Sequence, residues 1–163
     1  MTALKIEDLP HYTYAEYVHW EGRWELIDGI PYAMSPTPMK KHQALANRIG
    51  RLLDEALEEC ETCYASQPVD WKIGEDTVVQ PDNLVICESP EGMYITKTPP
   101  LIFEILSPST ARKDTGRKFE LYQVEGVLWY VIVDPEENMA KVYENLEGRF
   151  VKRLDATDET FRF

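Results

Sequence analysis

The chain has 163 residues, of which 44% are hydrophobic and 28% are charged, and its formal net charge is −12. This length predicts a single domain, residues 1–163, with a substantial buried core. The composition excludes a disordered chain, and no apolar run approaches the roughly 20 residues that cross a bilayer. The acidic start, residues 1–8, does not resemble a secretory signal, so we expect a cytoplasmic protein without membrane association.

Cysteine usage agrees with that compartment. Cys60, Cys63 and Cys87 are odd in number and cannot complete a disulfide framework. The Cys60-x-x-Cys63 spacing occurs in zinc and redox sites, but no second Cys or His pair stands at a ligand-like spacing. We therefore interpret the cysteines as structural thiols.

The first elements expected are a short helix and a hairpin. Thr13 can cap a helix that runs to about Trp20. Asp28-Gly29 lies between two short apolar segments, Trp24–Ile27 and Ile30–Met34. Such a pair favours a tight hairpin turn, because both residues accept a positive φ.

A long helix and several strands follow the break at Ser35–Pro38. From about Met39 to Cys60, apolar residues recur at helical spacing. Strands are predicted around Tyr64, over Val69–Ile73 and over Leu84–Cys87, where β-branched and aromatic residues gather. Pro, Gly and Ser between Glu88 and Pro100 indicate a loop.

The last part of the chain predicts a crossover and further strands. Leu101–Leu106 is apolar apart from Glu104, as in a strand that is buried on both faces. A helix from about Asp114 to Glu125 should end at Gly126. The strands after that helix are predicted over Leu128–Val133, Met139–Glu144 and Arg149–Leu154. This order predicts an α/β (α+β) domain, a mixed central β-sheet flanked by helices, with one right-handed crossover.

Two acids and a lysine are the candidate catalytic residues. Asp82 and Glu104 each interrupt an apolar stretch, where an unpaired charge is costly. Carboxylates from adjacent strands could share Mg²⁺ or Mn²⁺, which activates water and stabilises charge on a phosphodiester oxygen. Lys118 would add positive charge near the attacking water. Together they suffice for metal-dependent phosphodiester hydrolysis.

The spacing of these three residues leaves a structural alternative open for each. Asp82 follows Pro81 and could be a turn residue. Glu104 could be a buried acid paired with Lys or Arg. Lys118 stands four residues after Asp114 and could form an ordinary surface pair on the helix.

Motifs along nearly the whole chain carry a family resemblance. They are Trp24-Glu25-Leu26-Ile27-Asp28-Gly29, Met34-Ser35-Pro36-Thr37-Pro38, His42, Pro81-Asp82, the run Glu104–Thr110, Asp114, Lys118, Tyr122, Gly126-Val127 and Trp129-Tyr130-x-x-Val133-Asp134-Pro135. On these motifs the chain resembles the Uma-type putative restriction endonucleases, a branch of the PD-(D/E)XK nuclease superfamily. The resemblance implies a restriction-endonuclease-like core with Asp82 and Glu104 as metal ligands. The position two after Glu104 is Leu106 rather than lysine, and in the family the lysine role passes to the next helix, which here supplies Lys118.

Other residues are secondary candidates. Glu25 resembles an additional acid from the N-terminal part of such nucleases, or it is only a hairpin residue. His42 opens the long helix and could reach a phosphate or a water, or lie on the surface. Asp114 could bind metal but more simply caps its helix. The basic residues near Lys118 could contact nucleic acid or form a solvated helix face; they are Arg112, Lys113 and Arg117.

The function expected from these residues is a metal-dependent endonuclease that hydrolyses DNA phosphodiester bonds. The net charge of −12 opposes it, because phosphate binding draws its affinity from Lys and Arg. That charge favours the alternative, a catalytically inactive nuclease-fold protein with a binding or assembly role. Hydrolysis of a smaller phosphoester is a third function to test.

A homodimer would suit cleavage of two DNA strands. Exposed apolar strand residues are expected near Val142, Tyr143, Phe150 and Phe161–Phe163, where two copies could pair across a twofold axis.

Overall fold

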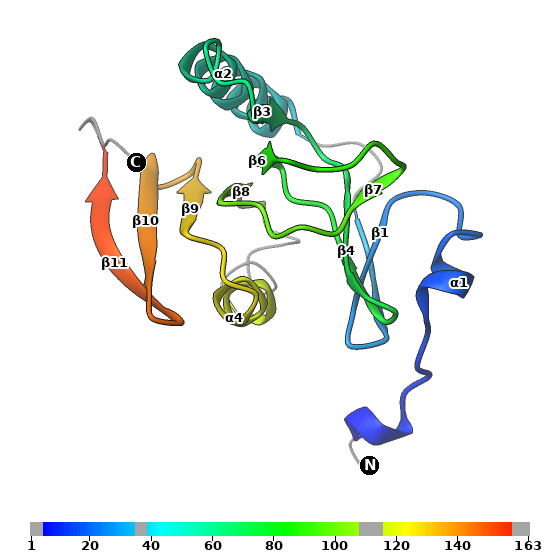
Figure 1. The fold of residues 1–163 in the computed structure, drawn as a ribbon. Helices are drawn as coiled ribbons and strands as arrows, with labels where there is room; N and C mark the ends of the chain where they lie inside the picture. The colour runs from blue at the N-terminus through cyan, green and yellow to red at the C-terminus, as the bar shows by residue number, and fades with distance from the viewer. Residues whose placement is uncertain (1–4, 35–38, 108–115, 158–163) are drawn as a thin grey trace.

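The computed structural model describes residues 5–34, 39–107 and 116–157 (Figure 1). Arg112, Lys113 and Asp114 lie outside the described residues, as do Ser35–Pro38 and Phe161–Phe163. Within the described ranges, no helix is long and apolar enough to cross a membrane.

The described helices are few and short apart from one. They are the 3₁₀ helix η1 (Ile6–Asp8) and the α-helices α1 (Tyr14–Tyr17), α2 (Lys40–Ala56) and α4 (Arg117–Val124). The predicted helix after Thr13 is therefore present but shorter than expected. Its start is a capping box, in which the Thr13 amide donates to Glu16 Oε2 over 2.7 Å.

The strands form two sheets. The five-stranded sheet, here called the N-terminal sheet, has the order β2 (Ile30–Ala33), β1 (Trp24–Ile27), β5 (Thr77–Val79), β4 (Asp70–Gly74) and β7 (Tyr94–Ile95). The six-stranded sheet, here called the main sheet, has the order β11 (Arg149–Ala156), β10 (Met139–Leu146), β9 (Trp129–Asp134), β8 (Leu101–Ile105), β6 (Asn83–Cys87) and β3 (Cys63–Ser66). The expected mixed α+β fold is confirmed.

The predicted hairpin joins β1 to β2. Asp28 and Gly29 occupy its turn with φ values of 51° and 77°, as the Asp-Gly pair predicts. A Cβ at position 29 would also displace the exposed His11 ring, in addition to the strain of the positive φ.

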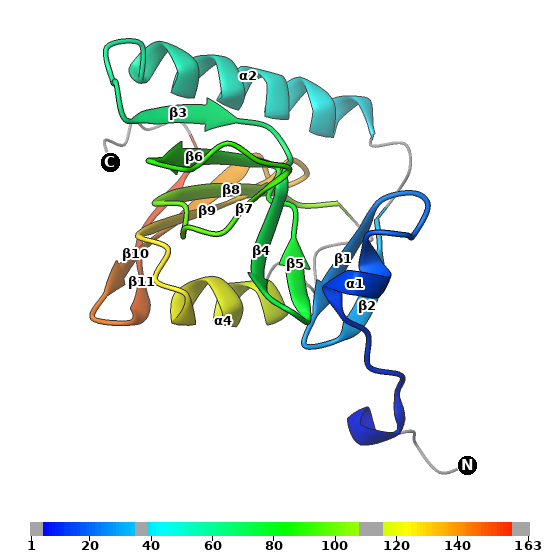
Figure 2. The same cartoon turned by 45° about the vertical axis from the view of Figure 1, so that its right-hand side comes forward.

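Two helices cover opposite faces of the main sheet (Figure 2). Alternate strand residues such as Val85 and Val131 pack with Leu53 of α2, while Ile102 and Tyr130 pack on the other face with Tyr122 of α4. Residues of the N-terminal sheet, including Trp71, belong to the same cluster as Tyr122. The helix α4 therefore packs against both sheets.

The predicted crossover runs from β8 through α4 to β9. These strands pair in parallel, with Phe103 opposite Val131. Four of the five residues of β8 are buried, as its apolar run predicts.

Two short strands were not predicted. β5 has three residues, and β7 has two residues inside the segment interpreted as a loop. The parallel pairing of β7 with β4 is non-local, so neither length nor composition reveals it.

The interpretation of the cysteines as thiols was wrong for two of them. Cys63 and Cys87 stand opposite each other on β3 and β6, with Cα atoms 4.1 Å apart, and form a disulfide. Strand register brings them together, which the spacing of cysteines in the sequence cannot show. Cys60 is a free, exposed cysteine.

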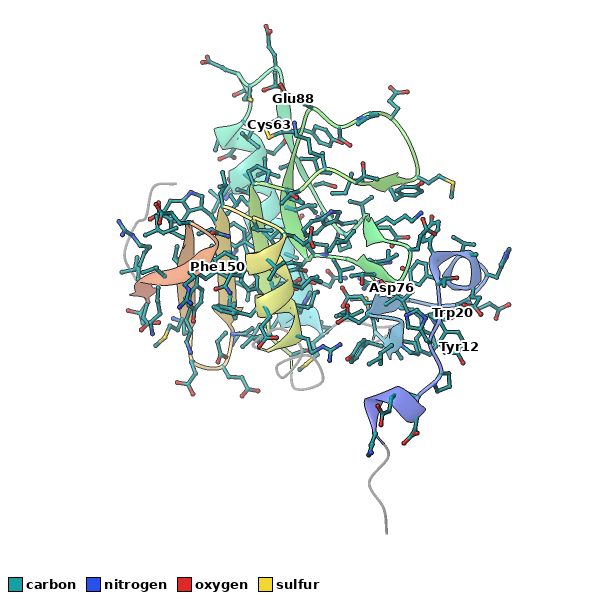
Figure 3. The ribbon with its side chains drawn as sticks, turned by 60° about the horizontal axis from the view of Figure 1, so that its bottom comes forward. Tyr12, Trp20, Cys63, Asp76, Glu88 and Phe150 are labelled. Atoms are coloured by element: carbon teal, nitrogen blue, oxygen red, sulfur yellow. A yellow bond between two sulfur atoms is a disulfide. The ribbon has the colours of Figure 1, made fainter. Side chains whose placement is uncertain are left out.

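The residues named for a dimer surface are less exposed than expected where they are described. Val142 is buried, and Tyr143 and Phe150 are half-buried against Phe119 of α4. The aromatic side chains fill the core between α4 and the strands β10 and β11 (Figure 3). Tyr143 and Phe150 therefore pack against the core, while Leu146 and Val151 are the exposed apolar residues of these two strands. The homodimer stays a prediction.

Candidate active site

Asp82 and Glu104 come from neighbouring strands of the main sheet. β6 and β8 pair antiparallel with Asn83 opposite Phe103, so continuing the register by one residue sets Asp82 opposite Glu104. Asp82 Oδ2 also accepts a hydrogen bond of 2.8 Å from the Ile105 amide. Both acids are buried, with exposed fractions of 8% and 2%. The structure thus brings the two predicted acids together.

Lys118 of α4 connects acids from the two sheets. Its Nζ lies 2.6 Å from Glu104 Oε1 in the main sheet and 2.9 Å from Glu25 Oε2 in the N-terminal sheet. Lys118 is 1% exposed and Glu25 is fully buried. The alternatives of a surface lysine and of a simple hairpin acid are therefore wrong. Glu104 is a buried acid paired with a lysine, and that lysine is the candidate catalytic one.

Two further groups hold the acids in place. The Gln80 amide donates to Glu25 Oε2 over 2.7 Å, and the Tyr122 hydroxyl donates to Glu104 Oε1 over 2.7 Å. Burial, together with the charge of Glu104, raises the pKa of Tyr122 well above its usual value, so the hydroxyl stays a donor.

Sequence reasoning gave Tyr122 only as one of the motif residues and missed its contact with Glu104. The available signal was its position four residues after Lys118, which places both side chains on one face of a helix.

His42 lies beside Asp82. Its Nε2 is 3.3 Å from Asp82 Oδ1, and its side chain is only 18% exposed, so the surface alternative is wrong. The side chain of Asn83 donates to the Ala46 carbonyl of α2 over 3.0 Å, which ties the helix carrying His42 to the strand that follows Asp82.

The environment of Asp82 favours its ionised form. Burial acts to raise its pKa, but the hydrogen bond and charge of His42, the Ile105 amide and the charge of Lys118 together lower it below the usual value. Asp82 is thus a carboxylate at neutral pH.

A cavity of about 210 Å³ opens beside Asp82. Its lining includes Arg23, His42, Gln43 and Gln67. Arg23 also contacts the Gln80 side chain over 3.5 Å. Sequence reasoning missed Arg23, because the residue precedes β1 and lacks a local motif of its own.

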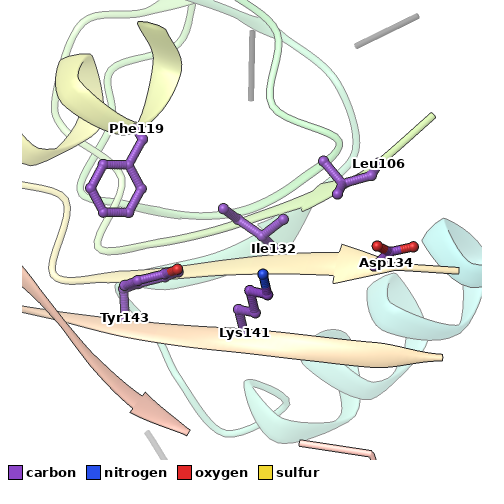
Figure 4. Close-up of a pocket in the computed structure, with 6 residues that line it drawn as sticks. All are labelled: Leu106, Phe119, Ile132, Asp134, Lys141 and Tyr143. Carbon is purple, nitrogen blue, oxygen red and sulfur yellow. The ribbon is translucent and has the colours of Figure 1, made fainter. Parts of the chain in front are cut away.

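A second cavity, of about 230 Å³, lies on the α4 face of the main sheet (Figure 4). Glu104 pairs with Ile132, and Ile132 pairs with Lys141, so the cavity lies in the same row across the sheet as Glu104. Its other lining residues include Phe119, Tyr143 and Asp134. The ammonium-bearing residue Lys141 on β10 is therefore two strands away from Glu104 on β8.

Arg117 is the described member of the predicted basic cluster. Its guanidinium lies 3.2 Å from Asp28 Oδ2 in the β1–β2 turn. The positive charge of Arg117, which was expected to attract phosphate, is therefore partly offset by an acid of the hairpin.

The donor set suits a hard cation that keeps water ligands. Asp82 and Glu104 offer carboxylate oxygens, and Mg²⁺ is commonly held by one or two carboxylates plus waters and substrate phosphate. In the described part of the chain, no group of three or more His, Cys, Asp and Glu side chains is arranged to hold a metal ion. The residues therefore fit an open two-carboxylate site and not a closed protein cage.

Comparison with known proteins gives consistent matches. The family model Uma2, described as "putative restriction endonuclease", matches residues 13–160. The uncharacterized protein slr1290 of Synechocystis is 33% identical over 116 residues, which are 66% of this chain. The chain spans 60% of the length of that relative.

A solved structure is also similar. It is a "putative nuclease belonging to DUF820" from Anabaena variabilis, with a TM-score of 0.77 and 19% identity. The match covers 93% of this chain and 88% of the other. At this identity the likeness concerns the fold.

Proposed function

Because the chain belongs to the Uma2 family of putative restriction endonucleases, we propose that it is a metal-dependent endonuclease that hydrolyses DNA phosphodiester bonds. The observation that carries the proposal is the buried Lys118, which contacts Glu104 and Glu25 while Asp82 stands opposite Glu104. A buried cluster of this kind is costly to maintain for structure alone, and perturbed acids with specific charge partners favour a functional site.

In this proposal Asp82 and Glu104 hold Mg²⁺ or Mn²⁺. When bound, such an ion activates a water molecule and stabilises negative charge on the phosphodiester oxygen. His42 orients Asp82 through the 3.3 Å contact, and the lowered pKa of Asp82 keeps that ligand ionised. Tyr122, which lies on α4, orients Glu104 through its hydroxyl hydrogen bond.

Lys118 supplies a positive charge beside Glu104, where the attacking water would lie. Glu25 acts as a positioning residue, because it contacts the Lys118 ammonium and is itself fixed by the Gln80 amide. Each of the two sheets thus contributes one acid that fixes the orientation of the lysine.

The charge of the site supports metal dependence. Asp82, Glu104 and Glu25 carry three formal negative charges against the single positive charge of Lys118, which leaves −2. A DNA phosphate is also anionic, and like charges repel strongly where the dielectric is low. One divalent cation would bring the formal charge of these four residues to zero, and Arg23 would then add local attraction beside Asp82.

Cleavage of plasmid DNA with Mg²⁺ or Mn²⁺ tests the proposal. Asp82→Asn and Glu104→Gln keep side-chain size and should each lower the cleavage rate by about 100-fold or more. Asp134→Asn is the control, because Asp134 is an acid at the end of β9 whose Oδ1 accepts from the Glu136 and Glu137 amides of the following turn. Cleavage by the Asp82→Asn protein at the parent rate would refute the assigned mechanism.

The alternative is a nuclease-fold protein that binds DNA or assembles without cutting. Its support is the net charge of −12. Calorimetry with Mg²⁺ and Mn²⁺ separates the two functions. A protein that binds neither ion at millimolar concentration and leaves DNA uncut favours the alternative.

A parallel screen of small phosphodiesters identifies a substrate other than DNA. Sedimentation tests the predicted homodimer.

A further inference from the structure

The disulfide lies at the end of β6 remote from the candidate active site. Asp82 directly precedes β6 and Cys87 ends it, which separates them by about 16 Å of extended chain. Figure 3 shows Cys63 and Glu88 together at one edge of the molecule. The disulfide therefore lies outside the group of residues proposed to bind the metal.

Cys60 lies in an exposed bend next to this disulfide. Residues 58–62 are all exposed and join α2 to β3. The Sγ of Cys60 is 3.8 Å from the Thr62 hydroxyl, and the same hydroxyl is 3.8 Å from Cys63 Sγ. A free thiol and a disulfide sulfur thus contact one common group within a four-residue segment.

The surroundings of Cys60 favour its thiolate, which is the form that attacks disulfides. The Thr62 amide contributes most to lowering the pKa of the Cys60 thiol, followed by the Thr62 hydroxyl and the Cys63 amide. The charge of Glu61 acts in the opposite direction. Cys63 and Cys87 are half-buried, so both sulfurs lie near the surface.

We propose that Cys60, Cys63 and Cys87 form a thiol–disulfide exchange site. The Cys60 thiolate attacks Cys63 Sγ, and its electron pair forms a Cys60–Cys63 disulfide. The Cys63–Cys87 bond breaks, and its bonding electron pair stays on Cys87 Sγ. The Cys87 thiolate then takes a proton from water. One disulfide replaces another, so the step needs no oxidant or reductant.

The charge around the cysteines selects the external partner. Glu58, Glu59 and Glu61 share the exposed bend with Cys60, while Glu88 follows Cys87 and pairs with Lys97 over 2.7 Å. This acidic surface repels anionic thiols and disulfides and attracts cationic ones. The site should therefore exchange with thiol compounds that carry positive charge.

Peptide mapping tests the internal step. The full chain, purified without reductant, is held at neutral pH, labelled with iodoacetamide after increasing times, and digested without reduction. We expect label on Cys87 as well as Cys60, together with a peptide that contains an internal Cys60–Cys63 disulfide. Label confined to Cys60 after many hours, or immediate label on all three cysteines, overturns the proposal.

Two variants and one dilution identify the attacking group. Cys60→Ser should keep the Cys63–Cys87 disulfide and take up no label, and its exposed position allows normal folding, which circular dichroism checks. Thr62→Val removes the shared hydroxyl and should slow the appearance of label on Cys87 severalfold.

A tenfold dilution of the parent protein should leave the rate of labelling at Cys87 unchanged, because the exchange is intramolecular. A rate that falls in proportion to concentration contradicts this.

Two small disulfides test the partner class. Cationic cystamine should form a mixed disulfide with the parent roughly tenfold faster than anionic oxidised glutathione at low salt. The two rates should converge in about 1 M salt, where surface charges are screened. Equal rates at low salt contradict the selection by charge.

Discussion

Lys118→Met removes a positive charge that lies between two buried carboxylates. Met also has a long unbranched side chain, so the main change is in charge. Removing one partner of a buried ion pair costs about 3–5 kcal/mol, because the remaining charge stays buried. Glu25 and Glu104 both lose their contact here, 2.9 and 2.6 Å long, so we expect a loss of at least about 4 kcal/mol.

Thermal unfolding followed by circular dichroism measures this loss. For a chain of 163 residues, about 4 kcal/mol corresponds to a fall in Tm of about 12 °C. Lys141→Met is the matched control, because Lys141 is exposed on β10, and it should change the free energy of unfolding by less than about 0.5 kcal/mol.

A triple variant separates charge from packing. Lys118→Met combined with Glu25→Gln and Glu104→Gln leaves an uncharged cluster, which should recover most of the lost stability. A Lys118→Met protein within about 1 kcal/mol of the parent would refute the electrostatic argument. A triple variant as unstable as Lys118→Met would assign the loss to packing instead.

Three further predictions concern stability. Tyr122→Phe should lose about 1.5–3 kcal/mol in urea unfolding, because the hydroxyl donates to a charged acceptor, and an unchanged midpoint would contradict that bond. The lowered pKa of Asp82 means that its stabilising contribution is full above the unfolded value of about 4 and is lost as the pH falls through the folded value. Asp82→Asn should therefore weaken the fall in stability between pH 5 and pH 2, and a parallel curve would contradict this. Reducing the Cys63–Cys87 bond, which spans 24 positions, should cost about 3.5 kcal/mol in urea unfolding, and an equal midpoint with and without reductant would refute that estimate.

Local signals predicted much of the fold. The Asp28-Gly29 turn depends on two residues that accept a positive φ, and the strand at Leu101–Ile105 depends on a continuous apolar run. Both determinants lie within a few residues, so the sequence displays them directly. The same holds for the buried acid Glu104, whose charge stands out against that run.

Non-local contacts could not be predicted in this way. Glu25 and Lys118 belong to elements far apart in the chain, and only the packing of α4 against both sheets brings them together. The Cys63–Cys87 disulfide depends on the register of β3 with β6. The resemblance to the family suggested Glu25 as an acid of the site, but its contact with Lys118 required the structure.

The position of Lys118 determines which variants can test catalysis. The same ammonium joins the two sheets and lies beside Glu104, so Lys118→Ala should lower both stability and cleavage. Loss of cleavage in that variant would not separate chemistry from folding. Asp82→Asn changes only one oxygen to a nitrogen and leaves the contacts of Lys118 with Glu25 and Glu104 in place. A folded Asp82→Asn protein that binds no Mg²⁺ and cuts no DNA would therefore assign the lost activity to the metal ligand itself.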